Sequence, residues 1–285
     1  MKRISKSSKT IKQGVRTNRL PVSVSGLITL LTDFGSEDYF VGAMKGVILS
    51  INPRAVTVDI THDIPRQDIE AAAFTLLASY RSFPTGTIHV AVVDPGVGSS
   101  RRPILVVASE QFFVGPDNGI FSYVLDSEPH HTVFQISDER YFRKPLSTTF
   151  HGRDVFAPIA AALSTGIPHD AFGPSITDEV RLHPLRPRNG KDGRVTGRII
   201  HIDHFGNCVT NFDRACLSGK TPTSLLLNGK RIERFYEFYG EAGDGRKPFA
   251  IWGSAGFLEI SSRNRSASKL LGVKRGDVIE LLAIK

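Results

Sequence analysis

The sequence predicts an α/β fold, with an N-terminal, mainly parallel sheet flanked by helices and a smaller all-β domain after it. Strand-like and helix-like segments alternate from residue 27 onward, residues 181–194 are rich in Pro, Gly and charge, and the later segments are short and strand-like. We therefore predict a basic, flexible tail over 1–26, an α/β domain over 27–185, a linker over 186–194 and an all-β domain over 195–285.

The alternation is clearest in the first five segments. Apolar runs over 27–34, 55–60 and 87–93 are of strand type, while residues 38–51 and 67–83 carry apolar side chains at helical spacing. This β-α-β-α-β order is typical of parallel strands with helices on the sheet faces. A strand over 103–109 and an alanine-rich helix over 154–166 extend the domain. The last domain is predicted from strand-like runs over 195–203, 223–229, 248–261 and 277–284.

Composition places the chain among ordinary globular proteins. It has 285 residues, 40% hydrophobic and 22% charged, and no apolar run approaches the roughly 20 residues of a membrane span. The net charge is +8, but the first 26 residues contain seven Lys and Arg and no acid, so the body is close to neutral. We therefore expect neither a membrane protein nor a nucleic-acid partner.

The tail and the cysteines bear on location. The tail lacks the apolar stretch of a secretory signal, and its composition fits a flexible extension, which we favour, a weak polyanion contact or an organelle transit segment. Cys208 and Cys216 form neither a disulfide framework nor a metal-site spacing. We expect a cytoplasmic protein.

Polar residues stand where the predicted strands end. Asp33, Asp59, Asp63 and Asp94 each follow an apolar run, as does the "PDNG" segment at 116–119. Any one of them is explained by a turn or a helix cap. Several at one sheet edge favour a polar ligand cleft.

The loop "DPGVGSSRR" and the segment "STTFHGRDVF" leave two interpretations open. Asp-Pro-Gly is a strong turn former, but a turn does not explain why Arg101 follows Asp94 across a Gly-rich loop. A carboxylate and a guanidinium at a strand end also form a candidate ligand site. His151, at a helix start, is either a capping or packing residue or a functional one.

Several familiar sites are disfavoured. The Gly-rich loop lacks the lysine of a P-loop and the third glycine of a dinucleotide fingerprint, and the chain contains no G-x-S-x-G or H-E-x-x-H motif. The histidines at 130, 131, 201 and 204 have too few neighbouring ligands to predict zinc. We therefore predict no metal site.

Six strings together carry a family resemblance: "LLTDFG", "VGAMKGVILSINP", "VVDPGVGSSRR", "PDNG", "STTFHGRDVF" and "IDHFGNCVTN". In this order, from about Leu27 to the C-terminus, they resemble the S-adenosyl-L-methionine hydroxide adenosyltransferase family, relatives of the bacterial fluorinases and chlorinases. The resemblance implies an α/β domain followed by a β-barrel-like domain. It also implies a homotrimer that binds its substrate between the first domain of one subunit and the second domain of its neighbour.

The implied reaction is an SN2 attack of water or hydroxide on the ribose C5′ of S-adenosyl-L-methionine, which releases L-methionine and leaves adenosine. S-adenosyl-L-methionine is then the substrate, and no cofactor is expected. The sulfonium makes methionine a good neutral leaving group, so catalysis reduces to placing and desolvating a water molecule. Carried over by motif, the catalytic trio falls on Asp94, Arg101 and His151. Which member takes the proton stays open.

The same resemblance implies substrate contacts. Asp33 matches the residue that accepts hydrogen bonds from the ribose hydroxyls. Asp203 and Asn207 match the positions at the methionine amino and carboxylate ends. The second domain reaches the methionine and adenine ends through Ser254, Phe257 and Glu259. The chain departs from the family pattern at Arg263 and Arg265, where an Asn and a small residue are usual. This departure argues against adenine contacts from that segment.

The sequence disfavours two other functions, a halogenase and a nucleotide-binding module. The related halogenases carry Tyr in place of Asp94 and a hydroxyl residue in place of Val97, and they lack the histidine. A carboxylate roughly 4 Å from a halide costs about 4 kcal/mol at an effective dielectric near 20, which favours water. A non-catalytic nucleotide-binding module is disfavoured by the missing P-loop lysine.

Overall fold

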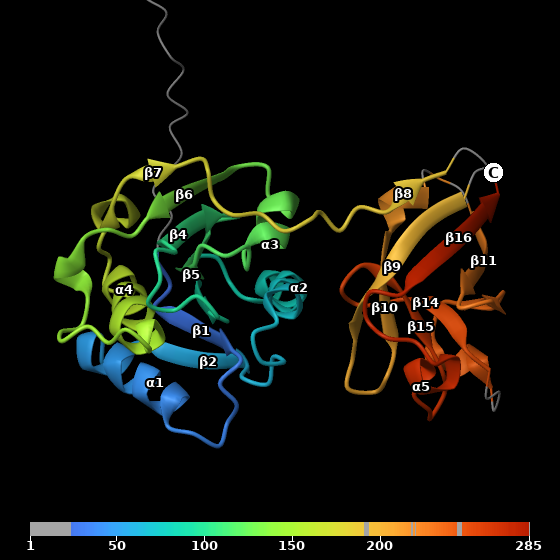
Figure 1. Ribbon diagram of the computed structural model, residues 1–285, viewed down its shortest axis with the longest axis horizontal. Helices are drawn as coiled ribbons and strands as arrows, with labels where there is room; N and C mark the ends of the chain where they lie inside the picture. The colour runs from blue at the N-terminus through green and yellow to red at the C-terminus, as the bar shows by residue number, and fades with distance from the viewer. Residues whose placement is uncertain (1–23, 191–193, 218, 220, 244–246, 285) are drawn as a thin grey trace, which may run out of the picture.

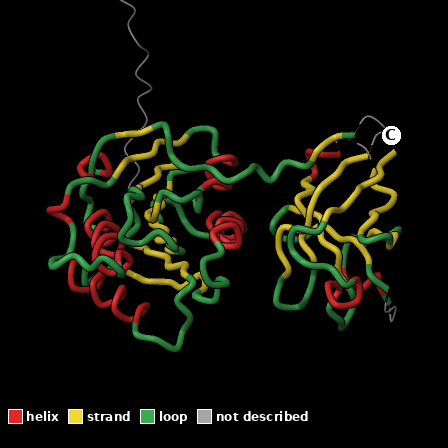
Figure 2. The backbone as a smooth tube through the Cα atoms, viewed as in Figure 1, coloured by secondary structure: helices red, strands yellow, loops and turns green. Residues whose placement is uncertain are grey.

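The computed structural model describes residues 24–284 apart from 191–193, 218, 220 and 244–246 (Figure 1). The predicted tail lies outside the described residues except for 24–26, as do residues 191–193 of the predicted linker. Two sheets dominate, one before and one after residue 187, and helices pack mainly on the first (Figure 2). The predicted domain boundaries stay predictions, and β8, Arg188–Asn189, falls inside the predicted linker.

The first sheet has the strand order β2-β1-β3-β5-β4-β6-β7 within the described residues. The strands are β1 (Leu27–Thr32), β2 (Val56–Thr61), β3 (Ile88–Val92), β4 (Pro103–Ala108), β5 (Gln111–Pro116), β6 (His131–Gln135) and β7 (Ser175–Ile176). The pairings run β2, β1, β3, β5 and β6 in one direction, with β4 and β7 opposed. The predicted mainly parallel sheet is confirmed.

Helices cover both faces of this sheet (Figure 1). They are α1 (Phe40–Ile51), α2 (Ile69–Ser79), α3 (Ser122–Ser127) and α4 (Ala157–Ser164). Each face of the sheet has its own hydrophobic core. Neighbouring residues of a strand belong to different cores, because successive side chains of a strand point to opposite faces of the sheet. Leu30 belongs to the core with Met44 of α1, while Leu31 belongs to the core with Leu76 of α2.

The connections define where a ligand is expected. From the carboxyl end of β1 the chain goes through α1 to β2, on one side, whereas from β3 it goes toward β4, on the other side. Adjacent parallel strands whose connections diverge form a topological switch point, where open α/β sheets bind ligands. Asp33 follows β1 and Asp94 follows β3, so these two of the predicted site residues lie at the switch point.

The second sheet curls around its own core into a half-barrel (Figure 1). Its strands are β8, β9 (Arg194–Ile202), β10 (Cys208–Asp213), β11 (Thr221–Leu227), β12 (Lys230–Ile232), β13 (Phe235–Tyr236), β14 (Phe249–Trp252), β15 (Phe257–Ser261) and β16 (Val278–Ile284), with helix α5 (Ala267–Leu271) packed beside them. Most pairings are antiparallel, and Phe212, Leu225 and Ile260 lie in the core. The predicted smaller, barrel-like β domain is confirmed.

Helix α2 joins the two sheets within the chain. Arg198 of β9 donates to Glu70 at 2.6 Å, and the ring of Phe74 stacks on His201 with centroids 5.0 Å apart. Phe257 packs on the same Phe74 ring, with centroids 6.0 Å apart. These contacts place the carboxyl-terminal sheet beside α2.

Candidate active site

The predicted catalytic trio forms one network at the end of β3. The Arg101 Nε atom lies 3.0 Å from each Asp94 carboxylate oxygen, and its Nη2 atom also donates to Asp94. The same Nη2 atom lies 2.8 Å from Nδ1 of His151. The Arg101 and Asp94 side chains are only 9% and 5% exposed. Arg101 thus links a carboxylate and an imidazole within a mostly buried ion pair.

The contact with Arg101 sets the protonation of His151. A guanidinium only donates hydrogen bonds, so Nδ1 of His151 accepts and the proton of the neutral ring is on Nε2. Burial lowers the pKa of His151 and the Arg101 charge lowers it further, against the opposing effects of Asp94 and Asp154. At neutral pH His151 is therefore an uncharged ring with a donor on Nε2.

Two features hold the histidine segment against the Asp94 loop. Gly98 has φ +76°, and a Cβ there would lie 2.3 Å from the carbonyl oxygen of Thr148, so the two loops approach backbone to backbone. His151 then leads into a π-helical turn, Gly152–Phe156, before α4. The buried Asp154 accepts from the Ser147 amide at 2.9 Å and fixes the loop before it.

Asp33 is oriented by its neighbours. Its Oδ2 atom accepts from the backbone amide of Gln67 at 2.8 Å, and Gln67 has the unusual φ of +64°. On either side of Asp33, Thr32 Oγ1 lies 2.9 Å from Nδ1 of His62, and the Gly35 amide donates to the His62 carbonyl at 2.8 Å. The Asp33 carboxylate is thus presented by a loop held at both ends.

A pocket of about 470 Å³ opens at this switch point. Among the predicted residues, Asp33, Asp94 and His151 line it, while Arg101 lies behind them. Phe34, Phe40 and Phe150 pack edge to face or tilted, with ring centroids 5.1–5.9 Å apart, and form its apolar wall. The remaining lining residues are Asp38, Arg66, Gln67, Val92, Pro95, Val97, Thr149 and Gly152.

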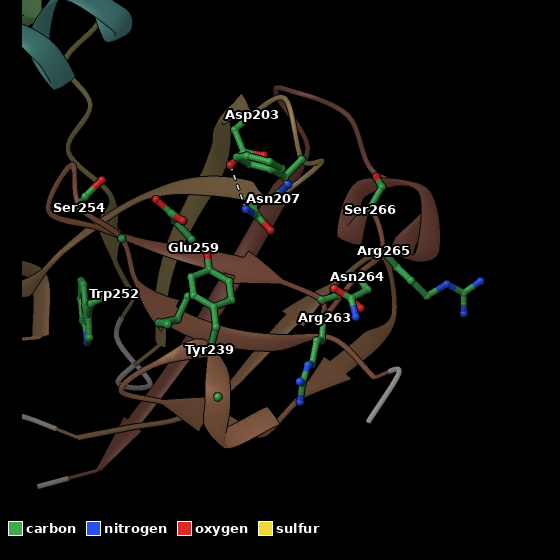
Figure 3. A pocket seen from close by; sticks show the side chains of 15 residues that line it. Asp203, Asn207, Tyr239, Trp252, Ser254, Glu259, Arg263, Asn264, Arg265 and Ser266 are labelled. Atoms are coloured by element: carbon green, nitrogen blue, oxygen red, sulfur yellow. Dashed lines mark hydrogen bonds between the residues drawn. The ribbon is translucent and has the colours of Figure 1, made fainter. Parts of the chain in front are cut away.

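A second pocket, of about 850 Å³, lies in the β domain (Figure 3). Asp203, Asn207, Ser254 and Glu259 line it, as do Arg263 and Arg265, where the chain departs from the family pattern. Phe257 lies elsewhere, at the contact with α2 described above, and lines neither of the two pockets. The structure thus divides the predicted substrate residues between two domains.

The second pocket contains residues that sequence reasoning missed. Phe205, Tyr239 and Trp252 line it, and Phe205 is 75% exposed. Phe205 lies inside the string "IDHFGNCVTN" that carries part of the family resemblance, so the sequence did contain a signal for it. Tyr239 begins a short 3-10 helix, Tyr239–Ala242, between β13 and β14, where no spacing or motif singles it out. The pocket therefore carries aromatic surface suited to an apolar or planar ligand part.

The pocket at the switch point and the carboxyl-terminal β sheet define an α/β protein with a polar cleft at the end of its first sheet. The family models for the SAM hydroxide adenosyltransferase N-terminal and C-terminal domains match residues 28–173 and 197–280. The chain belongs to the S-adenosyl-L-methionine hydroxide adenosyltransferase family.

Individual relatives agree with this assignment. Proteins named (R)-S-adenosyl-L-methionine hydrolase from Methanocaldococcus jannaschii and Thermus thermophilus are 38% and 36% identical, and the alignments cover 90% of this chain and 95% and 99% of theirs. The crystal structure of an uncharacterized conserved protein from Thermotoga maritima superposes with a TM-score of 0.83 at 34% identity, over 90% of this chain and 99% of that one. Proteins named fluorinase are more distant, at 23–26% identity.

Two further findings concern the described residues only. None of their helices is long and apolar enough to cross a membrane. They contain no group of three or more His, Cys, Asp or Glu side chains able to hold a metal ion.

Proposed function

We propose that the protein hydrolyses S-adenosyl-L-methionine to adenosine and L-methionine by attack of water on the ribose C5′. The observation that carries the proposal is the Asp94–Arg101–His151 network beside Asp33 at the switch point, in a chain of this family. The names of its hydrolase relatives specify the R configuration, and we propose the same epimer for this chain. We keep the predictions of no cofactor, no metal and a cytoplasmic location.

The geometry supports distinct roles for the three side chains. Nδ1 of His151 is occupied by Arg101 and its Nε2 carries the proton, so the neutral histidine donates to the oxygen of a water molecule rather than taking its proton. A carboxylate has about four lone-pair sites, so Asp94 still has acceptor capacity beyond Arg101. We therefore assign Asp94 as the group that accepts the proton of the attacking water.

The rest of the pocket supplies position and a dry environment. Asp33 faces the pocket beside the trio, where a carboxylate can accept hydrogen bonds from both ribose hydroxyls. The phenylalanine wall excludes water from the far side of the pocket. The breaking C5′–S bond leaves a neutral thioether, so the site requires no acid for the leaving group.

We also propose a homotrimer whose active site combines the two pockets from neighbouring subunits. The pockets belong to different domains, and among the described residues none lines both. Exposed aromatic side chains stand at both, with Tyr39 68% exposed beside the first pocket and Phe205 at the second. Large exposed aromatics around a pocket are typical of a surface that another chain covers.

Product analysis tests the reaction. The purified protein is incubated with the R or the S epimer of the substrate, in buffer with and without chloride or fluoride, and products are separated by chromatography. Adenosine and methionine in equal amounts from the R epimer, with no 5′-halogenated adenosine, are expected. A 5′-halo product would instead support the halogenase, which the Asp94 carboxylate disfavours.

A further inference from the structure

The pairing of β1 with β2 is irregular just before the loop that follows β1. Leu30 pairs with Asp59. The next residue of β1, Leu31, pairs with Thr61, so β2 has one extra residue at this point. Successive side chains of a strand point to opposite faces, and the extra residue therefore brings Asp59 and His62, three positions apart, onto the same face. Leu30 lies on this face too, in the core that α1 covers.

The His62 ring connects β2 with the last residue of β1. Its Nε2 atom lies 3.1 Å from Oδ1 of Asp59, and its Nδ1 atom lies 2.9 Å from Oγ1 of Thr32. Asp59 also accepts from Nζ of Lys45, on α1, at 2.6 Å. Burial raises the pKa of Asp59, but the contacts with Lys45 and His62 outweigh it and hold this pKa below its ordinary value. The charged carboxylate favours the His62 proton on Nε2, so Nδ1 accepts from the Thr32 hydroxyl.

The same histidine and threonine hold the backbone on both sides of Asp33. Thr32 Oγ1 accepts from the Phe34 amide at 3.3 Å, and the His62 carbonyl accepts from the Gly35 amide at 2.8 Å. The His62 side chain is only 9% exposed, so its surroundings restrict its movement. Asp33 thus stands between two anchors that both lead to His62.

Asp59, His62 and Thr32 also follow the order of a nucleophilic triad. A nucleophile must reach the substrate, however, and Thr32 is fully buried. None of these three described residues lines the pocket that contains Asp33. The three side chains therefore act on the reaction through the position of Asp33 and not through contact with the substrate.

We propose that His62 is a positioning residue of the reaction, which holds the Asp33 carboxylate where the two ribose hydroxyls donate to it. The inference rests on the proposed function, because it takes Asp33 as the acceptor of the ribose hydroxyls. A carboxylate that accepts both hydroxyls fixes the ribose, and with it C5′, relative to the water at Asp94 and His151. A displacement of about 1 Å in such a geometry costs roughly 100-fold in rate.

Two substitutions separate the contacts of the ring. In His62→Asn the side-chain amide reaches the position of Nδ1 and keeps an acceptor for Thr32, whereas in His62→Gln it reaches the position of Nε2 and keeps only the side of Asp59. The matched control is His89→Gln, because Nδ1 of His89 lies 2.7 Å from Oγ1 of Thr29, three residues earlier on β1 and outside the pocket. Calorimetric titration uses two probes, adenosine and 2′,3′-dideoxyadenosine, which lacks both hydroxyls. Turnover of S-adenosyl-L-methionine is measured in parallel, and circular dichroism verifies the fold.

The wild type should bind adenosine roughly 10-fold or more tightly than the dideoxy probe, because hydrogen bonds to a carboxylate are charge-assisted. His62→Gln should bind adenosine roughly 10-fold more weakly and the dideoxy probe almost as well as the wild type, and its kcat should fall by about 10-fold to 100-fold. His62→Asn and His89→Gln should keep the preference for adenosine and most of the turnover. Adding His62→Gln to Asp33→Asn should cause no further loss of preference, because both changes act through one carboxylate.

The possible failures differ from one another. A wild type that hydrolyses the substrate, with the full preference for adenosine kept in His62→Gln, overturns the role of His62 alone. An equal loss for both probes, or an equal loss of preference in His62→Asn and His62→Gln, also overturns it, since a merely structural role would weaken both probes and both variants. A wild type that hydrolyses the substrate but does not distinguish the probes overturns the ribose contact of Asp33 and the inference with it. A wild type that forms no adenosine overturns the proposed function itself.

Discussion

The buried Asp94–Arg101 pair offers the sharpest perturbation, Asp94→Asn. At the 3.0 Å separation of Nε and the carboxylate, the attraction is about 5.5 kcal/mol at an effective dielectric near 20, before the cost of burying both charges. The substitution keeps the shape of the side chain but leaves Arg101, only 9% exposed, without its counter-charge. Breaking one partner of such a pair costs about 3–5 kcal/mol of unfolding free energy.

A second variant separates stability from catalysis. In Asp94→Asn combined with Arg101→Met, no unpaired charge remains, so we expect the double variant to recover much of the lost stability, as replaced buried pairs commonly do. Turnover should fall by about 10²–10⁴ in both variants, because the proton acceptor is gone in both.

The assays are urea unfolding followed by circular dichroism, and adenosine formation at saturating substrate. Asp94→Asn as stable as the wild type would refute the buried ion pair. A double variant that is stable and also fully active would refute the role of Asp94 as the acceptor, since its fold would be intact.

The remaining predictions concern the histidine, the loop contact and the assembly. Because the folded state lowers the pKa of His151 below 6.5, the unfolded state takes up the proton more readily, so the free energy of unfolding should fall as the pH drops below about 6.5. Turnover should fall on the same acidic side, because the ring becomes charged. The His151→Ala variant, already slowed by orders of magnitude, should lose this acidic limb of the pH–rate profile. Gly98→Ala should destabilise by more than about 1 kcal/mol and lower kcat, whereas Gly229→Ala, with a similar φ of +72° but nothing within 4 Å of the added Cβ, controls for backbone strain alone; equal effects in the two would argue against the Thr148 contact. Mixing and reassembling two inactive variants, Asp94→Ala and Asp203→Ala, should restore activity in mixed oligomers, because some sites then combine an intact first pocket with an intact second one; no recovery despite subunit exchange would contradict an inter-subunit site.

The first domain was predictable because its elements are local and strongly periodic. The helix expected over 38–51 and the helix α1 observed at Phe40–Ile51 differ by only two residues at one end. The antiparallel hairpin of β4 and β5 was not expected. Its two-residue turn, Ser109 and Glu110, has φ of +51° and +58°, as in a type I′ turn, but lacks the Asn-Gly signal that normally marks such a turn.

The site was predictable in part. The ends of parallel strands meet at one sheet edge, so Asp33 and Asp94 were expected together. His151 is 57 residues beyond Asp94 in the sequence, and only the family resemblance joined it to the trio. Asp117 and Asn118 of "PDNG" support the site rather than line it, since Asp117 binds Arg102 and the Asn118 side chain donates to the Val93 carbonyl at 2.8 Å.

Phe257 illustrates what strand periodicity does not provide. It precedes Glu259 by two residues, and simple alternation places both on one face of β15. The pairing with β10 is irregular, because a register shift separates the Val209–Glu259 pair from the Asp213–Phe257 pair. Phe257 packs on Phe74 of α2 while Glu259 lines the pocket. A bulge of this kind leaves no mark in the sequence.

Incubation of the purified protein with S-adenosyl-L-methionine in oxygen-18 water tests the central claim most directly. Mass spectrometry of the products should show adenosine labelled at its 5′ oxygen and an equal amount of methionine, because water attacks C5′ while the C5′–S bond breaks. Adenosine without the label, or tight binding of the substrate with no adenosine, would contradict hydrolysis at C5′ by the Asp94–Arg101–His151 site.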